Sequence, residues 1–305
     1  MKKVLLIAGG GTLGTYTAKE LLRLGHSVDI VSIDKMASDD ENLRYFEAEA
    51  TLEYLEELFK REHYDGIVNF IHYSNYKDYI PYHELLTKNT GHLIFLSSYR
   101  VYADLEHPIT ENAPQLIDVI KDDDLFHEKE IYALSKSKAE RFLRNNPYPN
   151  NWTIVRPVIS FSSRRLDVTV VSGHAVIDYA KEKKPLPLSL KAKNLTAGLD
   201  WAGNSGKLIA NLLFKKECFG EAYTISSAQG LTWGEVAEIY TEFLGTEFEW
   251  TDIDYPHEEW GWHYDRIYNR DVDNSKVLKA TGLTKDDFTS IRDGIYIELK
   301  KLGAV

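Results

Sequence analysis

The stretch that decides the fold lies near the amino terminus and reads Val4-Leu5-Leu6-Ile7-Ala8-Gly9-Gly10-Gly11-Thr12-Leu13-Gly14. Its first four residues are all apolar, which suits a strand buried in the middle of a sheet. Downstream, Ala18, Leu21 and Leu22 recur at the spacing of one helix face, and Gly25 supplies a stop signal for that helix. The glycines therefore occupy the turn between a buried strand and an amphipathic helix.

Three of these glycines have the spacing of a dinucleotide-binding turn. Gly9, Gly11 and Gly14 satisfy GxGxxG in the strand-to-helix context that gives this pattern its meaning. Glycine lets the backbone approach a pyrophosphate closely, and the free N–H groups of the helix N-terminus can bind it. The unit predicts a site for NAD or NADP, and a tight turn that binds no ligand is the alternative.

The choice between the two dinucleotides stays open at the end of the second expected strand. An acidic side chain usually binds the adenosine ribose roughly 20 residues after the glycine turn. Ser32 stands at that position, Asp34 follows two residues later, and Lys35 is adjacent. We expect Ser32 and Asp34 to border the ribose, but a serine neither binds the ribose decisively nor repels a 2′-phosphate.

Strand-like and helix-like segments alternate along the first half of the chain, which is typical of a parallel sheet with helices on both faces. The expected strands after the first lie at 28–31, 67–71, 93–96 and 152–155, and further expected helices lie at 52–59, 232–244 and 290–302. The acidic segment 111–131 predicts a solvated loop. The fold class is therefore α/β, a doubly wound parallel (Rossmann) sheet with a smaller carboxy-terminal α/β substrate lobe. The expected division is a dinucleotide-binding domain at 1–160, completed by about 195–226, and a lobe at 161–194 and 227–305.

The composition is that of an ordinary globular protein. Of its 305 residues 43% are hydrophobic, and no stretch approaches the roughly 20 consecutive apolar residues of a membrane span. The net charge of −11 opposes non-specific binding to nucleic acid. Cys218 is the single cysteine, which excludes a CxxC metal site, and no zinc-ligand spacing occurs, so no metal is expected. A lone thiol fits a reducing cytoplasm.

A tyrosine and a lysine four residues apart form a second candidate site. Tyr132 and Lys136 would share one helix face, so the ammonium can lie near the phenol. At about 4 Å and an effective dielectric constant near ~20, this charge contributes roughly 4 kcal/mol, enough to lower a tyrosine pKa from about 10 to about 7. A phenol so tuned can transfer protons at neutral pH. The same spacing recurs, without a preceding strand that ends in serines, at Tyr73/Lys77, Tyr179/Lys183 and Tyr296/Lys300.

Several motifs follow one another in a recognisable order. They are the S-S-x-x-V-Y segment at 97–102, the P-x-x-E stretch at 108–111, the Y-x-x-x-K-x-x-x-E helix at 132–140, the strand at 153–157, and the segments 231–235 and 273–276. Together with the glycine turn, they resemble those of the extended short-chain dehydrogenase/reductases, specifically the NAD-dependent epimerase/dehydratase family. The resemblance runs nearly from end to end.

The resemblance implies a role for each of three polar residues. Tyr132 would be the general acid/base, Lys136 would bind the nicotinamide ribose and lower the tyrosine pKa, and Ser98 would hydrogen-bond the reacting oxygen. The residues implied to hold the dinucleotide are Gly9, Gly11, Thr12, Leu13 and Gly14 at the pyrophosphate, Asn69, Phe70 and Ile71 at the two riboses, and Ser97 and Pro157 beside them.

The chain departs from the family pattern at several positions. Ala8 stands where the first glycine would be, and Ala103 stands where glycine usually follows V-Y; both changes are small in volume. Ser32 replaces the typical acidic residue and leaves the cofactor choice open. Ser160-Phe161 replaces a tyrosine–glycine pair and leaves the substrate pocket open.

Other polar residues admit two interpretations. Arg266 and Arg270 could bind a substrate phosphate, or they could support the packing of an aromatic cluster made of Trp260, Trp262, Tyr264 and Tyr268. His72 could face the nicotinamide pocket, or it could be a structural, hydrogen-bonded histidine.

The expected function is NAD(P)-dependent oxidoreduction or epimerisation of a secondary alcohol or ketone, by family analogy that of a sugar or nucleotide sugar. The resemblance also implies a homodimer. The absence of a long apolar stretch argues against a membrane as partner, and the net charge argues against nucleic acid. The alternative is a non-catalytic NAD(P)-binding regulatory or RNA-binding protein, since the chloroplast stem-loop-binding proteins are a related branch. The intact Ser–Tyr–Lys set argues against lost chemistry, and the acidic balance argues against RNA.

Overall fold

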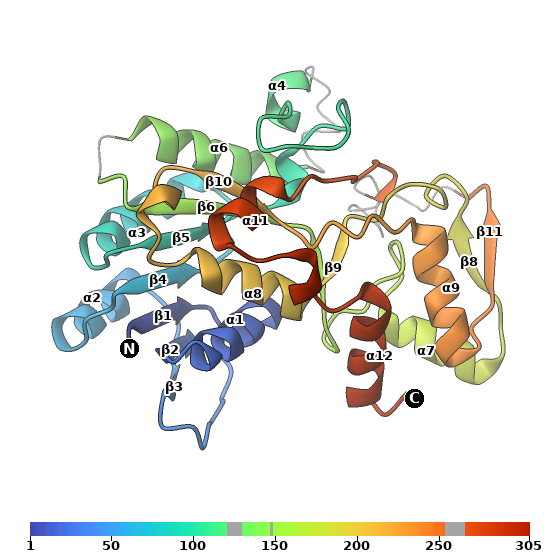
Figure 1. Ribbon diagram of the computed structural model, residues 1–305, viewed down its shortest axis with the longest axis horizontal. Coiled ribbons are helices and arrows are strands. Elements are labelled where there is room, and N and C mark those ends of the chain that lie inside the picture. The colour runs from blue at the N-terminus through green and yellow to red at the C-terminus, as the bar shows by residue number, and fades with distance from the viewer. Residues whose placement is uncertain (121–129, 147–148, 254–265) are drawn as a thin grey trace.

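The computed structural model describes residues 1–120, 130–146, 149–253 and 266–305. Within these residues, seven strands pair in one sheet, and every pairing is parallel. The strands are β1 (Lys3–Ile7), β2 (Ser27–Ser32), β3 (Leu43–Glu47), β4 (Gly66–Asn69), β5 (Leu93–Leu96), β6 (Trp152–Pro157) and β10 (Ala222–Ile225). They lie in the order β10-β6-β5-β4-β1-β2-β3 (Figure 1), so the predicted doubly wound parallel sheet is confirmed.

The order of the strands reverses between β1 and β4. Residues 4–7 of β1 pair with residues 28–31 of β2 on one side and with residues 66–69 of β4 on the other. The connections that follow β1 and β4 lead away in opposite directions, which opens a crevice at the carboxyl ends of these strands, and ligands of open α/β sheets bind there. Because the glycine turn follows β1, it lies at this switch point.

Helices cover both faces of the sheet (Figure 1). One face carries α1 (Thr12–Arg23), α8 (Ala202–Leu212) and α11 (Ser275–Thr281). The other face carries α2 (Leu52–Arg61), α3 (Tyr76–Lys88) and α6 (Ile131–Asn145). Leu6 of β1 belongs to the first core and Leu5 to the second. This two-sided burial explains why the opening strand is apolar throughout instead of alternating with polar residues.

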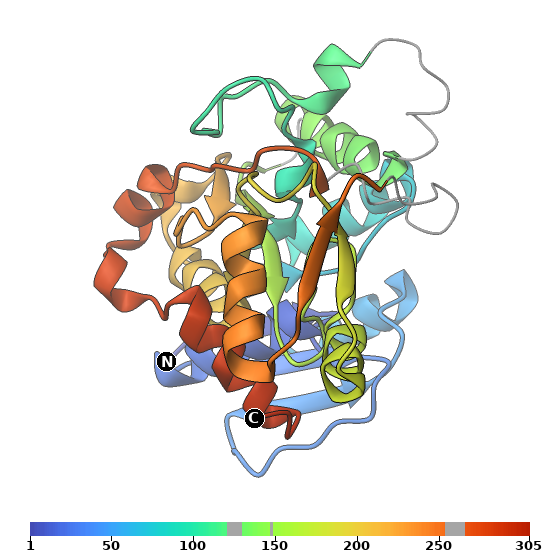
Figure 2. The same ribbon diagram turned by 90° about the vertical axis from the view of Figure 1, so that its right-hand side faces the viewer.

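A smaller lobe packs beside the sheet (Figure 2). Its strands form two parallel pairs, β7 (Ile159–Phe161) with β9 (Leu199–Trp201) and β8 (Leu186–Ser189) with β11 (Phe248–Thr251). Its helices are α7 (Gly173–Glu182), α9 (Trp233–Leu244) and α12 (Ile291–Lys301). Short elements elsewhere are α4 (Leu116–Val119), η1 (Tyr99–Val101), η2 (Lys216–Cys218) and η3 (Lys285–Asp287). Trp233 and Tyr240 of α9 share one apolar core with Ile295 and Leu299 of α12, so the two late helices hold the lobe together.

Capping residues explain where the late helices begin. Thr232 and Glu235 form a capping box at the start of α9, and Gly245 ends that helix in the left-handed conformation. Ser290 accepts a hydrogen bond from the backbone N–H of Asp293 and caps α12. The helices predicted at 232–244 and 290–302 are therefore confirmed to within a residue.

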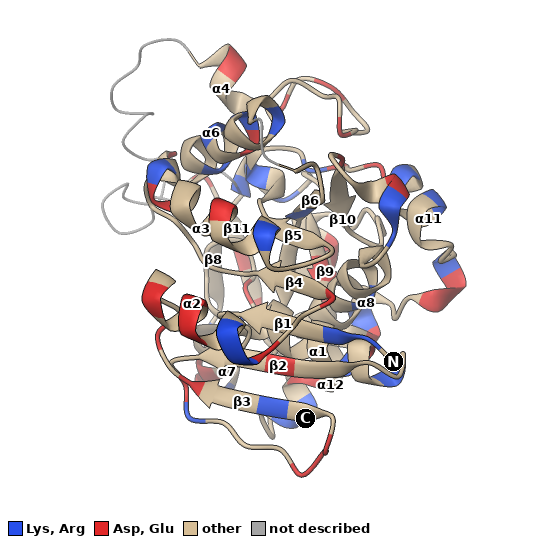
Figure 3. Cartoon of the chain, turned by 90° about the vertical axis from the view of Figure 1, so that its left-hand side faces the viewer, with Lys and Arg blue, Asp and Glu red and all other residues tan. Residues whose placement is uncertain are grey.

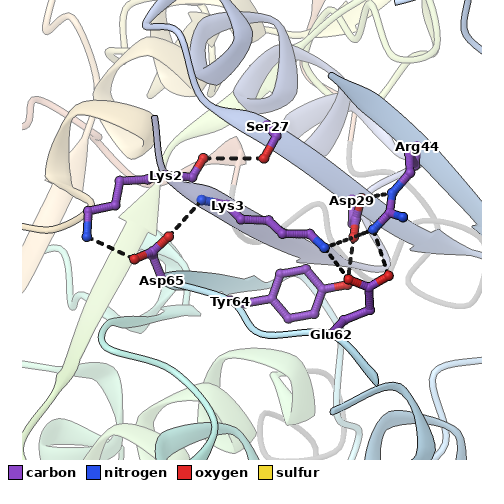
Figure 4. A network of polar contacts seen from close by, with 8 residues as sticks. All are labelled: Lys2, Lys3, Ser27, Asp29, Arg44, Glu62, Tyr64 and Asp65. Atoms are coloured by element: carbon purple, nitrogen blue, oxygen red, sulfur yellow. Dashed lines mark hydrogen bonds and ion pairs between the residues drawn. The ribbon is translucent and has the colours of Figure 1, made fainter. Parts of the chain in front are cut away.

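A polar network ties β1, β2 and β3 to the segment that precedes β4, near the amino-terminal ends of these strands (Figure 4). Asp29 on β2 is almost fully buried and accepts two hydrogen bonds from Arg44 on β3, of 2.8 and 2.6 Å, and one of 2.7 Å from Tyr64. Lys3 at the start of β1 lies 3.4 Å from the same carboxylate. Figure 3 shows the alternation of charge, basic on β1, acidic on β2 and basic on β3. Burial raises the pKa of Asp29, but hydrogen bonds from Arg44 and Tyr64 outweigh it and hold that pKa below its usual value.

Two expectations need adjustment. The strand expected at 67–71 ends at Asn69, so Phe70 and Ile71 belong to the loop after β4. The segment expected to be a loop at 111–131 contains the short helix α4, and Asp122 to Asp124 within it lie outside the described residues.

The domain boundaries near residues 160, 195 and 226 remain a prediction. Across the described parts of the chain, none of the helices is long and apolar enough to cross a membrane.

Candidate active site

The glycine turn presents the open N-terminus of α1 at the crevice. Gly11 is the N-cap, no side chain caps the helix, and its first turn contains no acidic residue. A Cβ on Gly14 would lie 2.2 Å from the carbonyl oxygen of Gly9, so glycine is required there for helix and strand to pack. A Cβ on Gly11 would meet nothing within 4 Å. The space beyond Gly11 is therefore open to a ligand that approaches the helix N–H groups.

Ala8 adopts the left-handed conformation, with φ of 54°. This is the position at which the family pattern has glycine, and alanine pays about 1–2 kcal/mol of steric strain there. Ala8 also lines the central cavity, so the strained residue lies at the site itself.

The ribose end of the turn is built around Ser32. Its hydroxyl accepts a hydrogen bond from the backbone N–H of Asp34, at 3.2 Å. A Cβ on Gly10 would lie 2.4 Å from the Ser32 oxygen and 3.2 Å from the Asp34 carboxylate. Ser32 is buried and shapes the loop, whereas Asp34 is 55% exposed and lies 3.9 Å from Arg164.

A cavity of about 480 Å³ opens beside the glycine turn. The expected site residues that line it are Gly11, Thr12, Leu13, Gly14, Phe70, Ser97, Ser98, Tyr132 and Pro157. The expected site residues outside its lining are Gly9, Ser32, Asp34, Asn69, Ile71 and Lys136. Gly9 packs beneath α1, and the amide of Asn69 is buried, where it donates a hydrogen bond of 3.0 Å to Tyr73 and accepts one from the N–H of Ile71.

Ser98 and Tyr132 line the same cavity from neighbouring elements. Ser98 follows β5 and caps η1, where its hydroxyl accepts a hydrogen bond from the N–H of Arg100. Tyr132 is half-buried in the first turn of α6. Lys136 follows one turn later, with its ammonium nitrogen 6.0 Å from the centre of the Tyr132 ring. The i, i+4 spacing thus places Lys136 beside Tyr132, and the end of β5 brings Ser98 to the same cavity as Tyr132.

Burial changes the electrostatics that the sequence suggested. The Lys136 side chain is 2% exposed and donates a hydrogen bond of 2.6 Å to the carbonyl oxygen of Leu96. Burial lowers its pKa to about 7, although the nearby carboxylate of Glu140 raises it. The charge on Lys136 therefore depends on pH near neutrality. The sequence-based expectation assumed that Lys136 carries a full positive charge at neutral pH, and burial of Lys136 contradicts this assumption.

Two further side chains flank the ring of Tyr132. His72 lies on it with ring centres 4.9 Å apart, and burial, aided by Lys136, lowers the pKa of His72. The guanidinium carbon of Arg100 lies 5.3 Å from the centre of the same ring, and Arg100 makes hydrogen bonds of 3.0 and 2.8 Å to the buried carboxylate of Glu130. Arg100 and Glu130 were not predicted, because nothing in their spacing links residues 100 and 130.

A buried ion pair between Glu140 on α6 and Arg156 on β6 lies next to the site. Glu140 accepts hydrogen bonds of 2.9 and 2.5 Å from Arg156 on β6 and one of 2.5 Å from Ser97. Arg156 also donates to the hydroxyl of Tyr102, which lies in the S-S-x-x-V-Y segment. The Ser97 hydroxyl therefore ties the segment after β5 to helix α6 through Glu140, while Ser97 also lines the cavity.

The smaller lobe contributes two arginines to the cavity. Arg165 and Arg266 line it, and both lie near the carboxylate of Asp167, at 2.7 and 3.8 Å. Arg270 does not line it and donates to the carbonyl oxygen of Tyr102 instead. Of the aromatic cluster considered with these arginines, Trp260, Trp262 and Tyr264 lie outside the described residues.

The other tyrosine–lysine pairs stay away from the cavity. Tyr73 is buried beneath the loop after β4, Tyr179 lies on α7, and Tyr296 lies on α12. These tyrosines are absent from its lining among the described residues. The strand context, and not the spacing alone, distinguishes Tyr132 from them.

No protein-family model and no curated protein sequence matches this chain. Solved structures do match it. UDP-glucose 4-epimerase from Thermotoga maritima, solved with UDP-glucose, has a TM-score of 0.71 at 13% identity and covers 99% of this chain and 98% of its own. dTDP-glucose 4,6-dehydratase from Bacillus anthracis, solved with NAD, has a TM-score of 0.73 at 18% identity and covers 98% and 96%.

The Bordetella bronchiseptica enzyme WbmG, solved with NAD and UDP, has a TM-score of 0.72 at 16% identity and covers 99% of this chain and 95% of its own. At such low sequence identity, structural similarity over whole chains establishes a shared fold. The chain has the fold of this epimerase, this dehydratase and WbmG, as its motifs predicted.

Proposed function

We propose that this chain is an NAD-dependent oxidoreductase or epimerase that acts on a secondary alcohol or ketone of a nucleotide sugar. The observation that carries the proposal is the single cavity shared by the N-terminus of α1, Ser98 and Tyr132, with Lys136 behind them. The N-terminus of α1 suits a pyrophosphate, and Tyr132 on the other side of the cavity can transfer a proton. A bound dinucleotide and the reacting carbon of a substrate would therefore meet between α1 and Tyr132.

The residues present fit a dinucleotide. The uncapped N–H groups of α1 and the open space above Gly11 suit its pyrophosphate. Asp34 would accept hydrogen bonds from the adenosine ribose and would repel a 2′-phosphate, which favours NAD over NADP. NAD also accompanies structures of similar fold. When bound, its nicotinamide would supply hydride transfer to and from the substrate carbon.

The protein's own residues would move the proton. Tyr132 would take the proton of the substrate hydroxyl or return it to a carbonyl, and Ser98 would orient the same oxygen. Lys136, fixed by the carbonyl of Leu96, would hold the ribose and adjust the charge felt by the phenol. Because Lys136 titrates near pH 7, its ammonium form is present at and below neutrality.

The charge of the lining supports an anionic substrate. Among the described residues that line the cavity, three are arginines and none is Asp or Glu, although the whole chain has a net charge of −11. Arg165 and Arg266 both lie near the carboxylate of Asp167, so the described lining offers guanidinium groups and no carboxylate of its own. The diphosphate of a nucleotide sugar would match this charge, and the similar epimerase was solved with UDP-glucose.

We also infer a homodimer in a reducing cytoplasm. The helix that carries Tyr132 presents Ile131, which is 54% exposed, and the buried thiol of Cys218 suits a reducing compartment. Light scattering of the purified protein tests the assembly, and a monomer at micromolar concentration would contradict it.

Native mass spectrometry of the purified protein tests the function most economically. We expect added mass equal to one NAD for each chain, and addition of UDP- or dTDP-sugars should give a further bound species. Calorimetric titration then compares NAD with NADP. A chain that binds neither dinucleotide would overturn the proposal.

A further inference from the structure

The loop Ser162–Arg165 of the smaller lobe crosses to the glycine turn. The hydroxyls of Ser162 and Thr12 are 2.9 Å apart, which joins the loop to the first residue of α1. Arg164 donates a hydrogen bond of 2.7 Å to the carbonyl oxygen of Gly10. These contacts join residues about 150 positions apart in the sequence and bring the loop to the mouth of the dinucleotide site.

Arg164 stands at the edge where the ribose and the pyrophosphate would meet. Its nearest nitrogen is 3.9 Å from the carboxylate of Asp34, and both side chains are about half exposed. An arginine carries five N–H donors, so its contacts with Gly10 and Asp34 leave donors for a ligand. The cation therefore lies between the ribose-binding acid and the uncapped start of α1.

A buried carboxylate fixes the loop from behind. Glu298 on α12 accepts a hydrogen bond of 2.8 Å from the backbone N–H of Ser163 through Oε2. Its Oε1 accepts one of 2.8 Å from the Trp201 indole, and also hydrogen bonds from Tyr16 on α1 and from Lys301. Glu298 thereby joins the loop, α1 and the carboxy-terminal helix in one rigid unit.

We propose that the Ser162–Arg165 loop is a clamp over the dinucleotide site, in which Arg164 contacts the dinucleotide phosphates and Glu298 is a positioning residue that holds the loop in place. The proposal rests on the proposed function, because it takes the glycine turn as a dinucleotide site. It extends that site to the second lobe and adds two residues that the glycine pattern does not include.

Calorimetric titration of the full chain with NAD and with adenosine tests the phosphate contact. Arg164→Met should weaken NAD binding by about tenfold to a hundredfold, as expected for a charge-assisted hydrogen bond, and should leave adenosine binding unchanged. Arg292→Met removes an equally exposed arginine of α12 and is the matched control, with NAD affinity expected to stay at the wild-type value. Equal NAD affinity in Arg164→Met and wild type would overturn the clamp.

A second background separates a phosphate contact from simple neutralisation of Asp34. In Asp34→Asn, the further change Arg164→Met should still weaken NAD binding by a similar factor. If that loss disappears without Asp34, Arg164 acts on the carboxylate alone and the phosphate contact is wrong. Wild-type protein that binds no NAD would instead overturn the proposed function, so the two failures are distinguishable.

Glu298→Gln tests the positioning role. With the Oε1 partners retained, the new amide would direct an N–H at the N–H of Ser163 and release the loop. We expect NAD affinity to fall several-fold while adenosine affinity is retained, which a purely structural role would not produce. An unchanged NAD affinity in folded Glu298→Gln contradicts the positioning role. Ser162→Ala removes the contact with Thr12 and the hydrogen bond that the Ser162 hydroxyl accepts from the backbone N–H of Arg164, and it gives the same test if Glu298→Gln fails to fold.

Discussion

The side chain of Lys136 donates a hydrogen bond of 2.6 Å to the carbonyl oxygen of Leu96, the last residue of β5. This contact joins the helix that carries Tyr132 to the carboxyl end of a central strand. It also holds the ammonium nitrogen out of water, 5.2 Å from the ring of Phe95. The result is a lysine whose pKa burial lowers to about 7.

Lys136 should make the stability of the fold depend on pH. The unfolded chain has the ordinary lysine pKa of 10.5, so between about pH 7 and 10.5 the unfolded state binds more protons than the folded state. The free energy of unfolding of the wild type, relative to Lys136→Met, should be lowest below pH 7 and should rise through this window. Denaturant titrations at several pH values measure it. A difference between the two proteins that does not vary with pH would exclude the titration assigned to Lys136.

Two glycines of the turn should respond in opposite ways to alanine. Gly14→Ala places a Cβ 2.2 Å from the oxygen of Gly9 and should destabilise the protein by about 3 kcal/mol or more. Gly11→Ala places its Cβ in open space and should cost less than about 1 kcal/mol, but the methyl group would occupy the approach to α1 and weaken NAD binding. Thermal unfolding and NAD titration of both variants check this. Equal stabilities would show that α1 does not pack on Gly9 as described.

The buried carboxylate of Asp29 should contribute to stability except in acid. Its folded-state pKa is lowered, so its contribution is present above about pH 3.8 and is lost as the pH falls through the lower folded-state value. Asp29→Asn should lower the free energy of unfolding at neutral pH by about 1–3 kcal/mol, because Arg44 and Tyr64 lose a charged acceptor. Glu57→Gln, which breaks only an exposed ion pair with Lys60, is the control and should change little. Equal losses in the two variants would count against the network.

Local patterns predicted five of the seven strands of the sheet, and they missed β3 (Leu43–Glu47) and β10 (Ala222–Ile225). The runs at 4–7 and 93–96 are apolar and lie within strands, as expected for strands buried on both faces, and 28–31 lies within β2 although it contains the charged residue Asp29. The end of β4 was misplaced, since Phe70 and Ile71 continue the apolar run after the pairing stops. Apolar character reports burial, and it does not report where strand pairing ends.

Contacts that depend on distant residues could not be predicted in this way. Ser162 meets Thr12, and Ser163 meets Glu298, across separations of 150 and 135 residues. Backbone N–H groups and single arginines carry no pattern that marks such partners. The depressed pKa of Lys136 was missed for a related reason, because burial of a lysine is a property of the packed fold.

The most direct test of the central claim is turnover by Tyr132→Phe. Protein loaded with NAD is mixed with a panel of UDP- and dTDP-sugars, and reduced nicotinamide and sugar products are followed for the wild type, Tyr132→Phe and the matched control Tyr179→Phe. With any sugar that the wild type turns over, we predict a loss of about 100-fold or more in Tyr132→Phe, unchanged NAD affinity, and wild-type rates in Tyr179→Phe. Turnover that survives in Tyr132→Phe at the wild-type rate would contradict the account.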